Sequence, residues 1–315
     1  MKITIVTPAG KRSRYGNRNT AARWAALLRD LGHGVRVEVE WSGRATDVMI
    51  ALHARRSHDS ILRFAQVHPS HPLIVALTGT DLYRDIRFDA GAQESMRLAK
   101  RMIVLQEMGL AELAPTLRRK TRVVYQSAPA AARQTRLKSC FEVIVSGHLR
   151  EEKDPFRAAA ALAHLPHESR IRVTHLGGAM SPEFAAEARR WTQREPRYRW
   201  LGEVTHGRAL RLLARSRVMV ISSRMEGGAN VVSESLAAGV PVIASRVSGN
   251  VGMLGRDYAG YYTLEGERAL AKLLARVETD AKFLRKLTAQ CRARKHLITE
   301  RNERNGLRDL LAEFT

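Results

Sequence analysis

The feature that most constrains this 315-residue chain is a regular alternation of short β-branched runs with longer amphipathic stretches, which occurs twice. Strands that alternate with helices in this way predict a parallel, doubly wound α/β sheet. The first series has apolar runs at residues 3–6, 35–39, 48–52, 73–77, 102–105 and 122–125, with helices expected over 20–31, 57–67 and 92–99. The second has runs at 141–146, 171–176, 198–201, 218–222 and 240–245, with helices expected near 156–164, 182–194, 206–215, 230–238 and 267–277.

A break in this pattern separates the two series. Residues 127–139 contain Pro129, several alanines and a charge cluster, and are typical of a linker. We expect an N-terminal domain over 1–137, a C-terminal domain over 138–300, and a terminal helix over 301–315 that packs back on the N-terminal domain. The helical pattern at this end of the chain extends from 280 to 314. Ligands of such sheets bind at the carboxyl ends of the strands, so the cleft between the domains is the expected site.

The charge of the chain is strongly positive. It has 53 Lys and Arg against 31 Asp and Glu, a formal net charge of +22. No block of five like charges and no nucleic-acid-binding motif accompanies it, and aromatic residues are only 6%, so a specific nucleic-acid partner is not expected. The excess reflects either compositional bias or an anionic substrate or surface.

Compartment signals are few. No run approaches 18 apolar residues, and the apolar run at 3–6 is too short for a signal peptide, so we expect no transmembrane segment and a cytoplasmic location. Cys140 and Cys291 lack metal-ligand spacing and are expected to be buried or incidental thiols.

The most informative segment, residues 222–245, has the pattern strand, Gly-rich loop, helix, strand. Glu226 lies in the loop and Glu234 about two turns into the helix. The loop backbone can approach a ligand closely at the helix N-terminus, where free N–H groups favour phosphate, and Glu234 could accept hydrogen bonds from sugar hydroxyls. The small residues of the loop are Gly227, Gly228 and Ala229. The alternative is a capped helix with two solvated glutamates.

This segment resembles the Glu-x7-Glu signature of the family-4 retaining glycosyltransferases, which have the GT-B fold. The resemblance implies two Rossmann-like domains that face each other across a cleft, the first for the acceptor and the second for the nucleotide-sugar. It implies that Glu234 holds the ribose and that Glu226 contacts the donor sugar as a catalytic residue. The usual Gly-Phe-Gly is replaced by residues 227–229. Donor contacts are implied for Gly227, Gly228, Ala229, Asn230 and Val231.

A second segment, SGHLREEKDP at residues 146–155, supports the resemblance. The family pattern Gly-Arg-Leu-x-x-x-Lys is matched at Gly147, Leu149 and Lys153, which implies that Lys153 is a catalytic contact to the diphosphate. His148 stands at the arginine position and Arg150 follows it, so either of them could take that role. The alternative for Lys153 is a solvated lysine at the start of a helix.

Weaker matches complete the expected donor site. Val204 belongs to a Gly-x-Val turn that lies against the nucleotide base in the family, and Gly16 and Asn17 match the glycine loop that closes over the donor phosphates. The chain has no Asp-x-Asp motif. The resemblance therefore implies metal-free catalysis, with no cofactor besides the substrates, in which cations and a helix N-terminus neutralise the leaving UDP.

Three unusual clusters, which together supply several arginines, lie at the carboxyl ends of strands of the first series, at residues 8–19, 51–57 and 77–85. Because the carboxyl ends of parallel strands share one edge of a sheet, the clusters should converge on the cleft. Arginine binds phosphate through two hydrogen bonds, which favours a second anionic substrate, although solvated surface arginine is the alternative. The residues concerned are Arg12, Arg14, Arg18, His53, Arg55, Arg56 and Arg84.

The third cluster departs from the family. Thr78-Gly79-Thr80-Asp81 stands where many members have His-Gly-x-Asp, which weakens the case for a hydroxyl acceptor. We predict catalytic roles for Thr78 and Asp81 and an acceptor contact for Thr80.

The segments GNRNTAARWAALLRDLGH, ALHARRSHDSI, LTGTDLYRDI, VVYQSAP, GANVVSE and SGNVGMLG resemble a narrower group, the selenosugar synthases of bacterial selenoneine biosynthesis. This resemblance implies transfer of a sugar, notably N-acetylglucosamine, from a UDP-sugar to selenophosphate. The product is a 1-selenosugar, and downstream enzymes of that pathway are implied as partners. A selenium nucleophile needs no general base, so the missing histidine is tolerable.

Two alternatives remain open at this stage. One is a family-4 enzyme that glycosylates a hydroxyl of a lipid or polysaccharide, its basic first domain docked on anionic lipid at the membrane surface. The other is a non-enzymatic protein that binds nucleic acid through charge alone.

Overall fold

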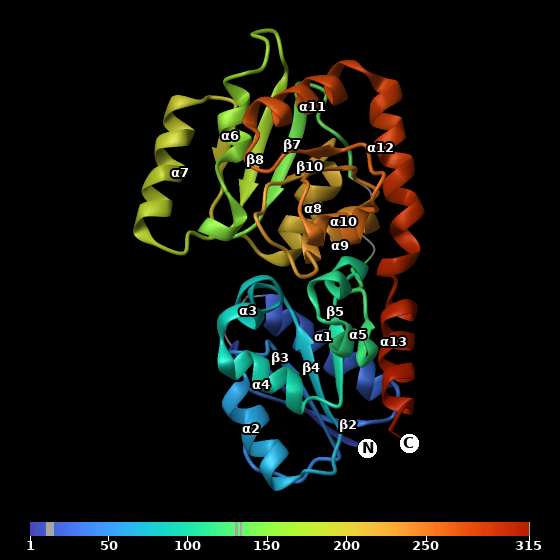
Figure 1. Cartoon of the computed structure of the whole chain (residues 1–315). Coiled ribbons are helices and arrows are strands. Elements are labelled where there is room, and N and C mark those ends of the chain that lie inside the picture. Colours follow the sequence, from blue (N-terminus) through green and yellow to red (C-terminus); the bar gives the residue numbers. More distant parts are fainter. Residues whose placement is uncertain (11–15, 130–131, 133, 315) are drawn as a thin grey trace. The chain divides into compact units, whose positions relative to one another are not determined.

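The computed structural model describes residues 1–10, 16–129, 132 and 134–314 (Figure 1). The chain forms two compact units: unit 1 comprises Met1–Ser127 and Thr299–Thr315, and unit 2 comprises Ala128–Ile298. The expected boundaries at 137/138 and 300/301 therefore shift to 127/128 and 298/299. The backbone N–H of Ala128 donates to the carbonyl of Ile298 at 3.2 Å, so the start of the linker pairs with the last residue of unit 2.

Unit 1 is built on a six-stranded sheet in the order β2-β1-β3-β4-β5-β6, with every pair parallel. Its strands are β1 (Lys2–Val6), β2 (Gly34–Glu38), β3 (Val48–Leu52), β4 (Leu73–Leu77), β5 (Arg101–Val104) and β6 (Thr121–Val123). Its helices are α1 (Gly16–Asp30), α2 (His58–Val67), α3 (Ile86–Phe88), α4 (Ala90–Leu98), α5 (Pro115–Arg119) and α13 (Glu300–Ala312), with short turns η1 (Asp81–Asp85) and η2 (Glu107–Glu112).

Alternating side chains of these strands enter two separate cores. On one face Ile3 and Ile50 pack with Trp24 of α1 and Leu307 of α13. On the other face Met49, the neighbour of Ile50, packs among side chains of α2 and α4. The sheet is thus covered on both sides, as the near-continuous apolar runs of a parallel sheet require.

A buried carboxylate fastens the terminal helix to unit 1. Glu303 of α13 is fully buried and accepts hydrogen bonds from Arg23 Nε (2.9 Å), from Trp24 Nε1 (2.7 Å) and from the backbone N–H of Ser127 (2.9 Å). The tract expected over 280–314 is not one helix: α12 (Ala281–Arg294), η4 (Lys295–Ile298) and α13 replace it. The break comes at Thr299, whose side chain caps α13 by accepting from the N–H of Asn302 at 3.2 Å.

Unit 2 has a second six-stranded parallel sheet, in the order β12-β11-β10-β7-β8-β9. Its strands are β7 (Phe141–Ser146), β8 (Ile171–Leu176), β9 (Tyr198–Trp200), β10 (Val218–Ile221), β11 (Val242–Ser245) and β12 (Tyr261–Tyr262). Its helices, besides α12, are α6 (Arg157–Leu162), α7 (Pro182–Arg194), α8 (His206–Arg215), α9 (Asn230–Ala238), α10 (Ser248–Leu254) and α11 (Glu267–Thr279), with the short turn η3 (Glu151–Lys153). The sequence did not predict β12, because two residues are too few for a periodic signal.

Each sheet reverses its strand order once. In unit 1 the adjacent strands β1 and β3 are followed by strands on opposite sides of the sheet, β2 and β4. In unit 2 the adjacent strands β7 and β10 are likewise followed by β8 and β11 on opposite sides. Loops that leave neighbouring strands in opposite directions open a crevice at the carboxyl ends, where ligands of such sheets bind. Among the residues that the structure describes, most of the expected site residues lie on the loops at these two positions or on the elements next to them, and Val204 follows the edge strand β9.

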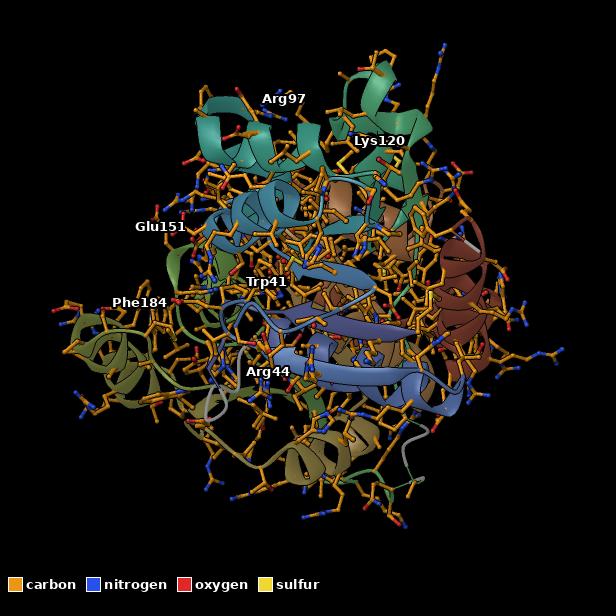
Figure 2. The ribbon with its side chains drawn as sticks, turned by 90° about the horizontal axis from the view of Figure 1, so that it is seen from below. Trp41, Arg44, Arg97, Lys120, Glu151 and Phe184 are labelled. Carbon is orange, nitrogen blue, oxygen red and sulfur yellow. The ribbon has the colours of Figure 1, made fainter. Side chains whose placement is uncertain are left out.

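The surface carries the positive charge broadly. In Figure 2 nitrogen-tipped side chains project from elements of both units. None of the helices among the described residues combines the length and apolar character needed to span a bilayer.

Candidate active site

The unit 2 site centres on an ion pair between the loops that follow β7 and β10. Nζ of Lys153, at the end of η3, lies 2.5 Å from Oε1 of Glu226. Ser223 Oγ donates to the same oxygen. Glu226 is only 7% exposed, so burial strengthens both contacts. The structure therefore brings together Lys153 and Glu226, which are 73 residues apart in the sequence.

A small pocket opens beside this pair. Among the described residues it is lined by Gly147, Lys153, His175, Ser223, Glu226 and Val231, with apolar residues of β7 and β10. Val231 is the second residue of α9, and Ala229 precedes that helix without a side-chain cap. The N-terminus of α9 thus adjoins the pocket.

Glu234 lies one turn further along α9 and has a partner of its own. Its Oε1 is 2.9 Å from Nε2 of His206, the first residue of α8. This hydrogen bond raises the pKa of His206. Val204 lies two residues before His206 in the half-buried turn that begins at Gly202. The carboxylate expected to hold ribose therefore lies beside the loop expected to hold the base.

His148 and Arg150 differ in charge. Burial lowers the pKa of His148 and outweighs the opposing effect of Glu203, so its ring is uncharged at neutral pH. Arg150 carries a guanidinium, a cation in proteins, whose Nε lies 3.9 Å from a Glu152 oxygen. Of the two residues, only Arg150 can supply a second cation near Lys153.

Glycines allow close backbone contact at this site. A Cβ on Gly249, in α10, would lie 1.8 Å from the carbonyl oxygen of Glu226. A Cβ on Gly177, where φ is +139°, would lie 2.0 Å from the carbonyl oxygen of Gly147. Any larger residue at either position would displace the loop that carries Glu226 or Gly147.

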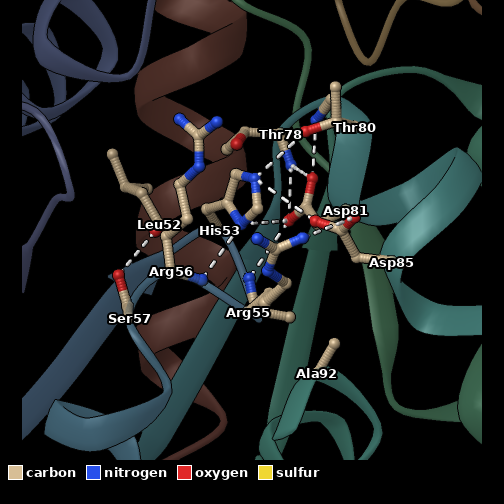
Figure 3. A network of polar contacts seen from close by, with 12 residues as sticks. Leu52, His53, Arg55, Arg56, Ser57, Thr78, Thr80, Asp81, Asp85 and Ala92 are labelled. Atoms are coloured by element: carbon tan, nitrogen blue, oxygen red, sulfur yellow. Dashed lines mark hydrogen bonds and ion pairs between the residues drawn. The ribbon is translucent and has the colours of Figure 1, made fainter. Parts of the chain in front are cut away.

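The unit 1 site lies on the loops that follow β1, β3 and β4. Gly16, Asn17 and Arg18 form the first turn of α1, where the Gly16 carbonyl accepts from Thr20 Oγ1 at 3.0 Å. Arg12 and Arg14 lie outside the described residues. The loops after β3 and β4 are joined by the network of polar contacts shown in Figure 3.

His53 is the centre of that network. It is 3% exposed and adopts the left-handed conformation, φ 76°, which is strained for a bulky residue. Its Nδ1 accepts the backbone N–H of Arg56 at 3.3 Å, so Nε2 carries the proton and donates to Thr80 Oγ1 at 3.2 Å. Burial lowers the pKa of His53 and outweighs Asp81, which would raise it. The ring is therefore neutral at neutral pH.

Asp81 joins the two loops. Its carboxylate is fully buried and accepts backbone N–H groups of Ala54 (3.1 Å), Thr78 (3.0 Å) and Gly79 (2.8 Å). Asp81 begins η1, a single π-helical turn of a kind often found at functional sites. The carboxylate is turned into the protein, so the structure gives it an anchoring role, and the catalytic roles of Asp81 and Thr78 stay predictions.

A second carboxylate, Asp85, gathers the arginines. It is buried and lies 3.4 Å from Arg55 Nη1 and 3.3 Å from Arg84 Nε. Both arginines are half exposed. In Figure 3 Arg55 turns toward the carboxylates, whereas Arg56 extends away from them into solvent. The adjacent arginines expected to act together therefore have different surroundings.

Four residues of these sites were not predicted from the sequence: Ser223, His206, His175 and Asp85. Serine three residues before a motif glutamate is a weak signal, and the other three depend on partners 28 or more residues away. Among the described residues, no group of three or more His, Cys, Asp or Glu side chains is placed to hold a metal ion.

Comparison with known proteins identifies the class. Residues 131–294, just over half of the chain, match the family Glycosyl transferases group 1, and the chain belongs to this family. No curated protein matches the sequence.

Solved structures share the fold. HepE from Anabaena, in complex with UDP and glucose, is 15% identical over 99% of this chain and 100% of its own, with a TM-score of 0.81. Sucrose-phosphate synthase from Thermosynechococcus elongatus is 15% identical over 100% and 99%, with a TM-score of 0.78. A glycosyltransferase from Rickettsia africae is 13% identical over 99% and 98%, with a TM-score of 0.76. The chain is a glycosyltransferase of the GT-B fold, as expected.

Proposed function

We propose that this enzyme transfers a sugar, N-acetylglucosamine being the expected one, from a UDP-sugar to selenophosphate without a metal ion. The selenium atom attacks C1 of the sugar, the C1–O bond to UDP breaks, and UDP leaves with the electron pair. Loss of the phosphoryl group to water releases phosphate and gives a 1-selenosugar, which would enter selenoneine biosynthesis.

The donor half of this proposal is supported by the Lys153–Glu226 pair at the strand reversal of unit 2. Lys153 can pass from Glu226 to the diphosphate, which puts a cation beside the charge that develops on UDP. The half-buried Glu234 carboxylate, one oxygen of which already accepts from His206, suits the ribose hydroxyls, and the N-terminus of α9 suits a phosphate. HepE, whose fold this chain shares, is described with UDP.

The acceptor half is carried by one observation: the groups of the unit 1 network that could serve as a general base are already engaged. Nδ1 of His53 accepts a backbone N–H, Asp81 accepts three, and Asp85 lies between two arginines. This suits a nucleophile that needs no base, as a selenolate does. The half-exposed guanidinium groups of Arg55 and Arg84 suit its anionic phosphoryl group.

The direct test is incubation with UDP-N-acetylglucosamine and selenophosphate, with and without EDTA. We expect equal UDP release in both and a hexosamine that carries the selenium isotope pattern in mass spectrometry. Replacing selenophosphate with phosphate is the control. UDP release without a selenium product, but with a hydroxyl acceptor, would refute the selenium assignment and leave the donor assignment intact.

One observation favours the membrane-surface alternative. Phe88, at the end of α3 in unit 1, is 84% exposed, and Arg87 beside it is 55% exposed. An exposed aromatic ring can insert at a membrane interface, and the neighbouring arginine, which is paired with Glu112 at 2.8 Å, can exchange that partner for an anionic headgroup. Flotation with anionic vesicles, compared between the wild type and Phe88→Ser, tests this: binding that depends on Phe88 would favour a lipid-linked hydroxyl acceptor.

A further inference from the structure

A chain of two hydrogen bonds lies behind the unit 2 pocket. Tyr198 of β9 and His175 of β8 are both buried, with the Tyr198 hydroxyl 2.8 Å from His175 Nδ1. On the other side of the ring, His175 Nε2 is 3.3 Å from the carbonyl oxygen of Gly147. The chain thus joins β9, through β8, to the first residue of the loop that leads to Lys153.

The direction of both bonds is fixed. A carbonyl oxygen can only accept, so His175 Nε2 carries the proton and Nδ1 must accept from the Tyr198 hydroxyl. Burial lowers the pKa of His175 to about 4, and burial also raises the pKa of Tyr198, so the ring is neutral and the hydroxyl protonated at neutral pH. Each group therefore has one role, and the arrangement has no second tautomer that satisfies both contacts.

Two polar side chains, His175 and Tyr198, are unusual inside a buried parallel sheet. Strands buried on both faces are normally apolar, and a buried imidazole costs free energy unless both of its nitrogens are satisfied. An apolar side chain at position 175 would fill the space without that cost. What the imidazole adds is its bond to the Gly147 carbonyl.

The backbone of Gly147 is held from other directions as well. Its N–H donates to the carbonyl of Leu176 at 2.8 Å, and Gly177 packs directly against its carbonyl. Trp200 of β9 donates from Nε1 to the Gly177 carbonyl at 2.8 Å. Gly147, His175 and Lys153 all line the pocket.

We propose that His175, supported by Tyr198, is a positioning residue for the donor diphosphate. The peptide between Gly147 and His148 is planar and trans, so its carbonyl and its N–H point in opposite directions. When the Gly147 carbonyl turns toward His175, its negative end points into the sheet and away from the diphosphate. The N–H of His148 then points the opposite way. The loop from Gly147 to Lys153 is then set in its binding geometry before the ligand arrives. The inference rests on the UDP-sugar site proposed above.

The test compares ligands with and without phosphate, by calorimetry with UDP and by competition with uridine. His175→Leu keeps the apolar volume and removes both hydrogen bonds, Tyr198→Phe removes only the hydroxyl, and His175→Gln keeps a donor and an acceptor. We expect UDP affinity to fall about tenfold in His175→Leu, less in Tyr198→Phe, and to recover in part in His175→Gln, with uridine affinity unchanged.

Tyr258→Phe is the matched control. Tyr258 is also buried and donates to a strand carbonyl, that of Val242, but it does not line the pocket. Its variant should bind UDP as the wild type does. UDP affinity that is unchanged in His175→Leu and Tyr198→Phe, or a loss shared equally by uridine, would overturn the inference. A wild type that binds no UDP would instead overturn the donor site, and the inference with it.

Discussion

The strand-reversal sites of the two units use buried carboxylates in opposite ways. In unit 2 the buried Glu226 faces a side-chain cation, Lys153, and a pocket. In unit 1 the buried Asp81 faces three backbone N–H groups. The first carboxylate holds a group that a ligand can take over, whereas the second holds the two loops to each other.

The two carboxylates therefore have different roles, ligand exchange in unit 2 and structural anchoring in unit 1. A cation that leaves its carboxylate for a diphosphate gains a stronger partner, so the unit 2 pair is suited to ligand exchange. Backbone N–H groups that lose Asp81 would be left buried and unsatisfied, so the unit 1 cluster is suited to staying fixed. The arginines around Asp85 are the part of unit 1 that solvent and an anion can reach.

The largest effect on activity should come from Lys153→Met. Loss of the cation beside the leaving diphosphate should lower kcat/KM by about 100-fold or more, as removal of a preorganised electrostatic partner does elsewhere. Steady-state kinetics with the UDP-sugar varied would measure it. Lys282→Met, at an exposed lysine of the same unit, is the control and should be nearly silent. A loss below threefold in Lys153→Met would refute the role of Lys153.

Asp81→Asn should act on stability instead. The amide can accept fewer N–H bonds than the carboxylate and turns its own N–H groups toward donors, so we expect a cost of about 2–3 kcal/mol. Denaturant unfolding of unit 1, followed through the buried Trp24 and Trp41, would measure it. UDP affinity, assigned to unit 2, should not change. Full stability with lost turnover would instead support the catalytic role predicted from the sequence.

The candidate residues of unit 2 were easier to group from the sequence than those of unit 1, for a physical reason. Glu226, Asn230 and Glu234 lie on one loop and the helix that follows, so their spacing alone placed them together. The partner Lys153 was found because its own loop carries a recognisable pattern. Their roles toward a UDP-sugar stay predictions.

Unit 1 depended on long-range contacts that spacing does not encode. Asp81 accepts from Ala54, 27 residues earlier, and His53 donates across the same gap to Thr80. The sequence therefore placed these residues at strand ends but could not show that Asp81 is enclosed or that Arg55 has an acidic partner. Glu303 is similar, because its burial depends on Arg23 and Trp24 from the opposite end of the chain.

The two sites account for only part of the net charge of +22. Many arginines form ion pairs with acids of their own unit, such as Arg215 with Glu142 and Arg122 with Glu313. Figure 2 shows nitrogen-tipped side chains on elements of both units. Since the charge is not gathered at either site, what matters for an anionic substrate is the few arginines at the strand ends.

Arg55→Ala should have a moderate effect, confined to the acceptor. Arg55 is 50% exposed and shared with Asp85, so its contribution to holding an anion is screened, and we expect the selenophosphate KM to rise about fivefold to tenfold. UDP affinity should stay the same. Arg268→Ala, at an exposed arginine of unit 2, is the control. If both variants raise the KM equally, the acceptor responds to overall charge and not to this site.

The smallest effects should come from two histidines, whose contributions to stability depend on pH with opposite sign. The folded pKa of His53 is lowered by burial, so its contribution is complete above about pH 6.5 and is lost as the pH falls toward the folded pKa. The folded pKa of His206 is raised by Glu234, so its contribution is present below about pH 6.5 and is lost as the pH rises through the folded pKa.

Melting temperatures at pH 5.5 and pH 9 would separate the two. His206→Ala should destabilise only at the lower pH, and by about 0.5 kcal/mol at most, because an exposed ion pair is weak. His53→Gln should instead reduce the difference between the melting temperatures at pH 5.5 and pH 9, because it removes a group whose protonation opposes folding. His167→Ala, at an exposed histidine of unit 2, is the control. If His206→Ala were equally destabilising at both pH values, its contact with Glu234 would not involve the charged ring, and Glu234 would be free to hold the ribose without competition from a cation.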